Sequence, residues 1–383
     1  MLGHFKKRGE SWYFWVELER GADGKRHQLS RGGFRTRKQA EKAYAEVRDQ
    51  LRQDSFVTPA KTTVGTFLVD EWLPAVRASI RPGTHDHYSK MVHGYVVPRI
   101  GGLKLGDLTP GQLNAFYADL LVDGRLHGGP SQPAGLSPKT VRHVHTLLHK
   151  ALADAVRWGN LGRNPADRAE PPRPRTAEMK VWDLTQLRRF LTWVETNRLG
   201  PIWLLMATTG MRRGEVLGLR WADVNLDGGR ISVVQTHVLV DRLVIVSEPK
   251  TAKGRRSVAL DPTTVSALRQ YRRLQREERL RYGELWTDTG LVATHEDGTA
   301  INPRLFSAWF TQHARAADLP LIRLHDLRHS YATAALSAGI PAKVVSERLG
   351  HANIAITLDT YSHVLPNMQE QAAEQVAQLI LGS

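Results

Sequence analysis

A proline-rich, charged segment interrupts this chain between residues 164 and 180. It reads NPADRAEPPRPRTAEMK and has neither the period of a helix nor that of a strand. Proline removes a backbone donor and disfavours a helical conformation in the residue before it, so this composition is typical of a linker. The sequence therefore predicts separately folded parts, with a boundary near residue 175 and a linker over residues 166–180.

The length of 383 residues indicates two or three domains, and the apolar content of 41% suffices for packed cores. No apolar run approaches the ~18 residues of a membrane-spanning helix, and the first ten residues lack the apolar centre of a signal peptide. We expect the protein to stay inside the cell.

The formal net charge is +15, which predicts attraction to a polyanion, most often nucleic acid. An anionic membrane surface is the weaker interpretation. The chain has no cysteine, which excludes disulfides, thiolate catalysis and cysteine-based zinc modules. Any chemistry must come from His, Tyr, Arg, Lys, Ser or carboxylates.

Residues 1–60 predict a small α+β module, a three-stranded antiparallel sheet followed by one helix over residues 37–51. Residues 1–63 hold 14 Lys and Arg against 8 Asp and Glu, a surplus of 6. A DNA-facing sheet with Arg35, Arg37 and Lys38 as contacts fits this surplus, and so does a solvated basic surface.

Residues 64–165 predict an all-α domain. Thr109 with Gln112 forms a capping box, and Ser137 with Pro138 forms a cap and first turn. The last helix has one apolar stripe, made of Val141, Val144, Leu148, Ala151, Leu152 and Ala155. Its other side is basic, with Lys139, Arg142, His143, His149 and Lys150. Of these, Lys139, Arg142 and Lys150 are candidate DNA contacts, although solvated helix faces are often basic as well.

Residues 181–383 predict a mostly helical α+β domain with one small antiparallel sheet, built from strands within residues 229–239, 242–250 and 255–261. The segment LHDLRH, residues 324–329, is the most informative part of it. His325 and His329 lie four apart on one helix face, as in a zinc site, but Arg328 lies on the same face. A fixed cation repels a metal ion, whereas guanidinium geometry matches phosphate. The segment alone leaves metal and phosphate as the two candidate ligands, and the rest of the chain has to decide between them.

Three further segments carry residues of the same kind. TTGMRRGE contains Arg212 and Glu215 three apart, and a predicted hairpin places Lys250 at the end of a strand. LGHANIAITLDTY contains His351 and, ten residues later, Tyr361. Each segment alone is weak evidence, because arginines pair with carboxylates and tyrosines pack in cores without any catalytic role.

The order and spacing of these segments over about 150 residues resemble the catalytic domain of the tyrosine recombinases, the phage integrase family. The segment around Arg212 is similar to the family's first arginine box, Lys250 to its hairpin lysine and residues 325–329 to its H-x-L-R-H box. His351 lies in its third box, and Tyr361 falls where the family places its nucleophile. Residues 64–165 resemble its core-binding (SAM-like) domain and residues 1–60 its arm-type DNA-binding domain, by layout more than by motif.

The resemblance implies a role for each residue, and elementary chemistry agrees. Tyr361 would attack a DNA phosphorus, while Arg212 and Arg328 would bind the non-bridging oxygens on which charge accumulates. Lys250 is the expected general acid, with Lys253 as a rival; His325 would assist proton transfer from Tyr361, and His351 would donate to the phosphate. Glu215 would orient Arg212, and His329 would be structural, packed or bonded to backbone. We expect no metal and no cofactor.

The implied reaction is site-specific integration and excision of a phage or mobile element through a 3′-phosphotyrosyl link and a Holliday junction. The expected partners are core-type and arm-type sites on double-stranded DNA and three further copies of the chain on that DNA. An excisionase and a host DNA-bending protein are further candidate partners. The resemblance also implies a cytoplasmic protein that associates with the bacterial nucleoid. Two alternatives stay open: a sequence-specific DNA-binding protein with an idle site, and a topoisomerase of related chemistry. At the C-terminus, helical spacing of apolar residues fits a helix that docks on a neighbour or on its own chain, namely Ala373, Val376, Ala377, Ile380 and Leu381.

Overall fold

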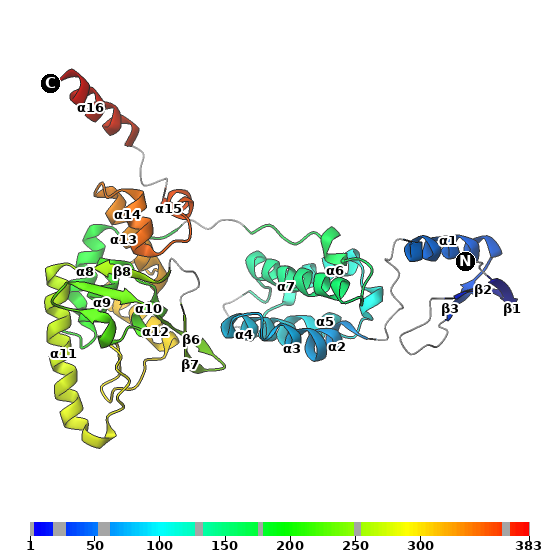
Figure 1. The fold of residues 1–383 in the computed structure, drawn as a ribbon, viewed down its shortest axis with the longest axis horizontal. Helices are drawn as coiled ribbons and strands as arrows, with labels where there is room; N and C mark the ends of the chain where they lie inside the picture. The colour runs from blue at the N-terminus through cyan, green and yellow to red at the C-terminus, as the bar shows by residue number, and fades with distance from the viewer. Residues whose placement is uncertain are drawn as a thin grey trace. The chain divides into compact units, whose positions relative to one another are not determined.

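The structure is a computed structural model that describes residues 4–17, 28–52, 62–126, 133–174, 179–248, 254–361 and 368–382. The chain divides into two compact units, residues 1–176 and 177–383. The multidomain fold class predicted from the sequence is confirmed: a small α+β module, an all-α domain and a mostly helical α+β domain follow one another along the chain (Figure 1).

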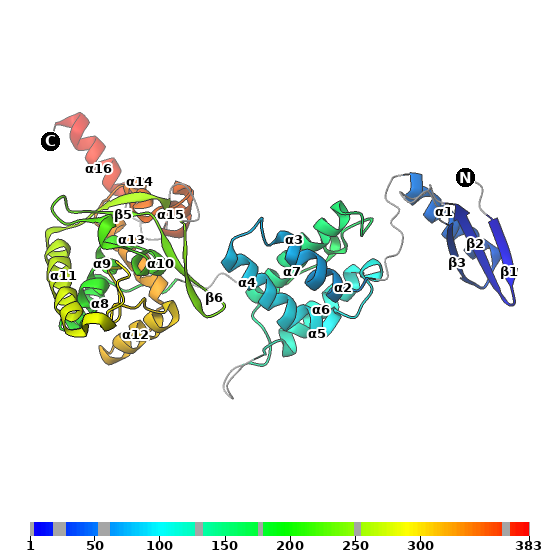
Figure 2. The ribbon, with the colours of Figure 1, turned by 60° about the horizontal axis from the view of Figure 1, so that its bottom comes forward.

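The N-terminal module is a three-stranded antiparallel sheet with one helix. Strands β1 (His4–Arg8), β2 (Ser11–Glu17) and β3 (Gln28–Phe34) pair in the order β1-β2-β3, and helix α1 spans Arg37–Arg52. Alternate residues of β2 point to one face, so Phe14 and Val16 are buried against Ala40 and Val47 of α1. The helix covers this face of the sheet (Figure 2).

The all-α domain has a core built from every one of its longer helices. Its elements are α2 (Val64–Thr66), η1 (Phe67–Trp72), α3 (Leu73–Val76), α4 (Pro82–Met91), η2 (Val92–Val96), α5 (Val97–Ile100), η3 (Leu105–Asp107), α6 (Pro110–Asp123), α7 (Pro138–Arg157) and η4 (Pro165–Arg168). Two of them, η1 and η2, are π-helical turns, and each precedes a proline in the next helix, Pro74 or Pro98. A proline lacks the donor of a normal turn and crowds the carbonyl four residues earlier, so a wider turn relieves the strain.

The predicted caps and the predicted stripe of this domain are confirmed. Thr109 and Gln112 form the capping box at the start of α6, and Ser137 Oγ accepts a hydrogen bond from the Thr140 amide at the start of α7. All six stripe residues of α7 are buried. Lys139, Arg142 and Lys150 lie exposed on the other side of the helix.

The second unit contains most of the helices. They are α8 (Leu184–Val194), α9 (Gly200–Thr209), α10 (Arg213–Leu217), α11 (Pro262–Tyr282), α12 (Pro303–Ala316), α13 (Leu324–Ser337), α14 (Ala342–Leu349), α15 (Ile354–Tyr361) and α16 (Met368–Leu381), with short turns η5 (Trp221–Asp223) and η7 (Gly283–Leu285). The long helix α11 runs along one side of the unit (Figure 1). The main core includes Trp203 of α9 stacked on Phe306 of α12, with ring centroids 4.2 Å apart.

The strands of this unit form two small antiparallel sheets where the sequence predicted one. Strands β4 (Val224–Asn225), β5 (Arg230–Val233) and β8 (Arg256–Ala259) make the first, and β6 (Thr236–Val240) and β7 (Leu243–Ser247) the second. The predicted strand at residues 229–239 is broken at Gln235, whose side-chain amide donates to the Gly218 carbonyl at 2.8 Å. The bond lies between the end of β5, which pairs with β8, and the start of β6, which pairs with β7.

Helix α16 spans the C-terminal residues for which a helix was predicted. Ala373, Val376, Ala377, Ile380 and Leu381 are all exposed on it. In the described part of the chain, no helix combines the length and apolar character that crossing a membrane requires.

The capping box at Thr109 gives a testable prediction. Thr109→Ala removes the side-chain acceptor for the Gln112 amide, which should cost about 1 kcal/mol of local stability. Hydrogen exchange of the α6 amides in the full-length chain should become roughly fivefold faster. Thr146→Ala is the control, because the Thr146 hydroxyl only donates back to the Arg142 carbonyl of its own helix. Equal exchange rates of the α6 amides in wild type and Thr109→Ala would show that the Thr109 cap does not stabilise α6.

Candidate active site

Helix α13 of the second unit carries two of the predicted histidines and one of the predicted arginines. The helix begins after Arg323, whose amide donates to the Asp326 carboxylate at 2.8 Å. One turn separates His325 from His329, and their rings meet edge to face with centroids 5.1 Å apart. The separation of four residues in the sequence therefore does place these two rings together.

Arg328 is fixed by two carbonyls from distant segments. Its side chain is buried and donates to Gly210 O at 2.8 Å and to Leu349 O at 2.7 Å. Gly210 ends α9 with φ +63°, and a Cβ there would meet the ring of Tyr331 at 2.5 Å, so this position requires glycine. Burial and the charge of Arg212 lower the pKa of Arg328 to about 9, which leaves the guanidinium charged at pH 7.

Arg212 lies two residues after Gly210 and is held by Glu215. Arg212 Nη1 donates to Glu215 Oε1 at 2.8 Å, its amide donates to Oε2 at 2.9 Å, and Nη2 donates to Gly350 O at 3.2 Å. The Arg212 side chain is still 38% exposed, whereas that of Glu215 is 4% exposed. Glu215 and the Gly350 carbonyl thus hold Arg212 in place, and the exposed part of its side chain remains accessible to a ligand.

A third arginine, Arg256 of β8, shares the Glu215 carboxylate. Arg256 Nη1 and Nη2 donate to Oε1 and Oε2 of Glu215 at 3.1 and 2.9 Å. Burial alone raises the pKa of the Glu215 carboxyl, but the hydrogen bonds and charge of Arg256 and the charge of Arg212 outweigh it and hold that pKa at about 2. Glu215 is therefore a buried carboxylate between two cations.

His351 follows the end of α14 and is oriented by α15. Its Nδ1 lies 2.8 Å from Thr357 Oγ1. Burial and the charges of Arg328 and Arg212 lower the pKa of His351 to about 4. Burial, with His329 and Arg328 as neighbours, likewise lowers the pKa of His325 to about 4. Both imidazoles are neutral at pH 7 while nothing anionic is bound.

Tyr361 is the last residue of α15 and is buried in a small apolar cluster of its own. The cluster is formed by Ala332, Ala335, Leu336, Val345, Leu349 and Tyr361. Burial raises the pKa of the phenol to about 12, although Arg328 acts in the opposite direction. The hydroxyl is therefore protonated at neutral pH and lies 2.6 Å from Nδ1 of His329.

The contact of Tyr361 differs from the sequence-based expectation. His325 was expected to assist proton transfer from this hydroxyl, and His329 to pack or to bond to backbone. The structure instead pairs Tyr361 with His329. Tyr361 lies in the cluster that contains Ala332 and Leu336, from the later turns of α13, and His329 is nearer to those turns than His325.

Two residues at the site were missed by sequence reasoning. Arg256 and Thr357 each contact a predicted site residue, Glu215 and His351. Strand alternation could have indicated Arg256, since it lies two residues before the buried Val258 and so faces the core in β8. Thr357 carries no comparable signal, because a threonine within a helix has many uses.

The other predicted residues lie elsewhere or outside the described residues. Lys250 and its rival Lys253 fall in the gap between residues 248 and 254. Arg35, Arg37 and Lys38 are exposed at the start of α1, where Arg37 pairs with Glu41 at 2.9 Å. Within the described ranges, no three His, Asp or Glu side chains are grouped as a metal site would need.

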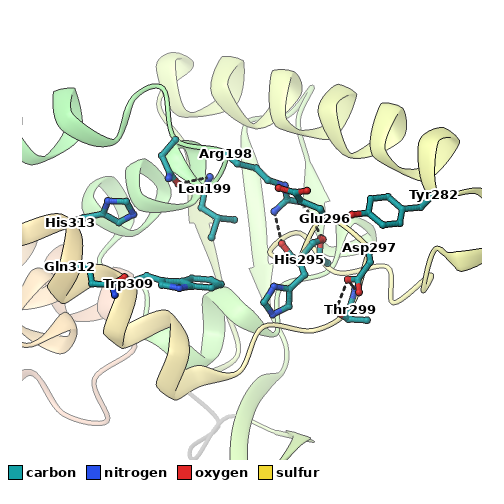
Figure 3. Close-up of a pocket in the computed structure, with 12 residues that line it drawn as sticks. Arg198, Leu199, Tyr282, His295, Glu296, Asp297, Thr299, Trp309, Gln312 and His313 are labelled. Atoms are coloured by element: carbon teal, nitrogen blue, oxygen red, sulfur yellow. Dashed lines mark hydrogen bonds between the residues drawn. The ribbon is translucent and has the colours of Figure 1, made fainter. Parts of the chain in front are cut away.

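A cavity of about 770 Å³ lies away from these residues (Figure 3). It is bounded by the loop before α9, the end of α11, residues 294–299 and α12, with Trp309 and His295 in edge-to-face contact. No candidate catalytic residue lines it.

The buried carboxylate gives a pH-dependent prediction. Because the folded-state pKa of Glu215 lies below the ordinary 4.5, its carboxylate stabilises the fold above pH 4.5, and this contribution is lost as the pH falls towards about 2. Glu215→Gln should cost roughly 3 kcal/mol at pH 7, as expected when a buried ion pair loses one partner, and progressively less below pH 4.5.

Thermal unfolding of the full chain at several pH values measures this difference. Asp227→Asn is the control, because Asp227 is 93% exposed in its pair with Arg269 and should change little at any pH. A Glu215→Gln deficit that is the same at pH 7 and near pH 2 would contradict the assignment.

Comparison with known families gives two matches within this chain. The phage integrase family matches residues 181–368, and the arm DNA-binding domain matches residues 4–51. The first range contains the four segments described above, and the second contains the three-stranded sheet and nearly all of α1.

Known proteins resemble the chain over most of its length. The tyrosine recombinase XerC-like protein of Caldanaerobacter subterraneus is 28% identical, with 99% of each chain covered. The ICEBs1 integrase of Bacillus subtilis is 24% identical over 90% of this chain and 91% of its own. In fold, the chain is similar to the Tn1549 transposon integrase solved with transposon right end DNA, at a TM-score of 0.67 and 17% identity, over 82% of this chain and 100% of that one. With an integrase domain over the arginine and histidine segments and an arm domain before it, this chain belongs to the phage integrase family of tyrosine recombinases.

Proposed function

We propose that this chain is a site-specific DNA recombinase that uses Tyr361 to cut and rejoin DNA, integrating and excising a phage or mobile element. One observation carries the proposal: hydrogen bonds join residues 210–215, 328–329 and 349–361, which carry both candidate arginines and Tyr361, and the Arg212 side chain stays 38% exposed. Arg328 and Arg212 donate to consecutive carbonyls, Leu349 and Gly350, directly before His351. Membership of the integrase family supports the same function.

In the proposed reaction, the Tyr361 hydroxyl attacks a backbone phosphorus. The new bond links the tyrosine oxygen to the 3′ phosphate, and the 5′ oxygen leaves and takes a proton. The 5′ hydroxyl of a second duplex then attacks the phosphotyrosine, which restores a phosphodiester and frees the tyrosine. The bond energy is retained in the covalent link, so the exchange requires no ATP.

The surrounding residues have distinct proposed roles. Arg212 and Arg328 bind the non-bridging oxygens, where negative charge develops. His329, in contact with the hydroxyl at 2.6 Å, accepts or relays its proton, while the neutral His325 and His351 donate to the phosphate. Lys250, whose role rests on family resemblance, protonates the leaving 5′ oxygen, with Lys253 as the second candidate.

The remaining parts of the chain are proposed to hold the DNA. Residues 1–60 would bind arm-type sites, with Arg35, Arg37 and Lys38 as contacts, and residues 64–165 core-type sites, with Lys139, Arg142 and Lys150. Residues 166–180 are the proposed linker and residues 181–383 the proposed catalytic domain. Exchange between two duplexes cuts four strands, and each tyrosine holds one, so four copies act together through a Holliday junction.

The proposed setting follows from the substrate. A bacterial chromosome is the target of such a reaction, so we propose action in the cytoplasm at the nucleoid. An excisionase and a host DNA-bending protein are proposed partners. Without them, the choice between integration and excision and the bending of the DNA would depend on the recombinase alone.

The nucleophile is tested by trapping the covalent adduct. The purified protein is mixed with DNA from the flanks of its own gene in EDTA and quenched with SDS. A protein–DNA band is expected with wild type and absent with Tyr361→Phe. Tyr331→Phe is the matched control, because this tyrosine packs against the same apolar cluster and its hydroxyl accepts a bond from Arg348. Specific binding without any adduct, even on a nicked trapping substrate, would instead favour a DNA-binding protein with an idle site.

The phosphate contacts are tested by the rate of adduct formation. Arg328→Ala should slow single-turnover cleavage by about 100-fold or more, since the loss of one donor to a developing oxyanion costs roughly 3 kcal/mol. Its affinity for the same DNA should change far less, because the two DNA-holding domains are untouched. A cleavage rate within a few-fold of wild type would show that Arg328 does not contact the reacting phosphate.

A further inference from the structure

The last turn of α14 presents three consecutive carbonyls to three different arginines. Arg348 O accepts from Arg256 Nε at 2.6 Å, Leu349 O from Arg328 Nη2 at 2.7 Å, and Gly350 O from Arg212 Nη2 at 3.2 Å. The final carbonyls of a helix have no partner within the helix and carry a partial negative charge. The arginines therefore complete this helix end and fix it at the same time.

Arg256 differs from Arg212 in where its donors go. Its side chain is 7% exposed, and its contacts are all to the protein: both oxygens of Glu215, the Arg348 carbonyl and the Gly254 carbonyl at 3.2 Å. Arg212 is 38% exposed by comparison. Arg256 thus bonds to groups of the protein, while Arg212 keeps exposed donor groups that a ligand can reach.

The backbone at Gly350 leaves space for the Arg256 side chain. Gly350 ends α14 with φ +66°, and a Cβ there would lie 2.9 Å from Arg256 Nη1. A side chain at this position would push against the guanidinium and strain the backbone. The glycine before His351 thus lets Arg256 reach both the helix end and Glu215.

Arg256 also determines how Glu215 can hold Arg212. Glu215 Oε1 accepts from Nη1 of Arg212 at 2.8 Å and from Nη1 of Arg256 at 3.1 Å. Without Arg256, the buried carboxylate would turn toward its one remaining cation, and the helix end would lose one of three anchors. Arg212 and the loop that carries His351 would then shift relative to each other.

We infer that Arg256 is a positioning residue for DNA cleavage: by joining Glu215 to the last turn of α14, it sets the direction of Arg212 and its position relative to His351. The inference rests on the proposed function, in which Arg212 contacts the reacting phosphate. Arg256 itself touches no DNA and acts through Arg212.

The test is a double-mutant cycle on single-turnover adduct formation, carried out in the full-length protein well below the melting temperature of every variant. Arg256→Gln should slow adduct formation by about 100-fold, the scale expected for a misplacement near 1 Å, with DNA affinity within a few-fold of wild type. In an Arg212→Lys background, the same change should have an effect of less than about threefold, since residues that act as one unit are not additive. A purely structural defect would lower the rate by the same factor in both backgrounds, and that result would overturn the inference.

Two further variants keep the test decisive. Arg256→Lys retains the charge but loses the planar fork, so it should fold and still slow adduct formation by about tenfold, again only when Arg212 is present. A wild-type rate for Arg256→Lys would overturn the inference. Arg269→Gln is the matched control and should cleave normally: Arg269 likewise bonds a carboxylate, Asp227 at 2.6 Å, and a carbonyl, Leu226 at 3.2 Å, but on the surface.

The failure of the inference can be told apart from the failure of the proposed function. If wild type and Arg269→Gln form the adduct and Arg256→Gln does so at the same rate, only the positioning role fails. If wild type forms no adduct, the proposed function fails first.

Discussion

The active-site region depends on one buried carboxylate, Glu215. Three guanidiniums lie close to it, and two of them, Arg212 and Arg256, bond to its oxygens. Unpaired, these cations could not be placed together in a poorly hydrated region, because like charges repel and each loses its water. Glu215 offsets one positive charge and the carbonyls ending α14 offset part of the rest. The region is left with an excess of positive charge, which supports the proposal that it binds a phosphate.

This excess acts together with burial to keep His325 and His351 neutral without DNA. Burial and the nearby arginines lower the pKa of His325 and of His351 to about 4. A bound phosphate would offset part of this positive charge and raise the pKa of both histidines, so the imidazoles would take up protons more readily once a phosphate is bound. In the proposed mechanism, the positive charge would therefore favour a phosphate ligand, and the phosphate would favour proton uptake by His325 and His351.

The sequence predicted what is carried by short motifs and regular periodicity, and little of what depends on long-range contacts. The helix positions of His325 and Arg328, the capping box at Thr109 and the stripe of α7 all depend on spacing within one helix, which the sequence displays directly. The partner of Tyr361 could not be predicted in this way, because the choice between two histidines one turn apart depends on where α15 packs. The break at Gln235, which divides the strands between two sheets, also depends on a side-chain bond to a residue 17 positions away.

The long-range contacts also couple catalysis to folding. Arg212 and Gly350 are 138 residues apart in the chain, and Arg328 bonds to Gly210 across 118 residues. Each bond joins a segment that carries a reacting group to a backbone carbonyl, so the geometry exists only when the core beneath it is complete. In the proposed reaction, a partly folded chain would bring the tyrosine near DNA without the two guanidiniums that are proposed to stabilise the transition state. The proposed cleavage therefore depends on the fully folded domain.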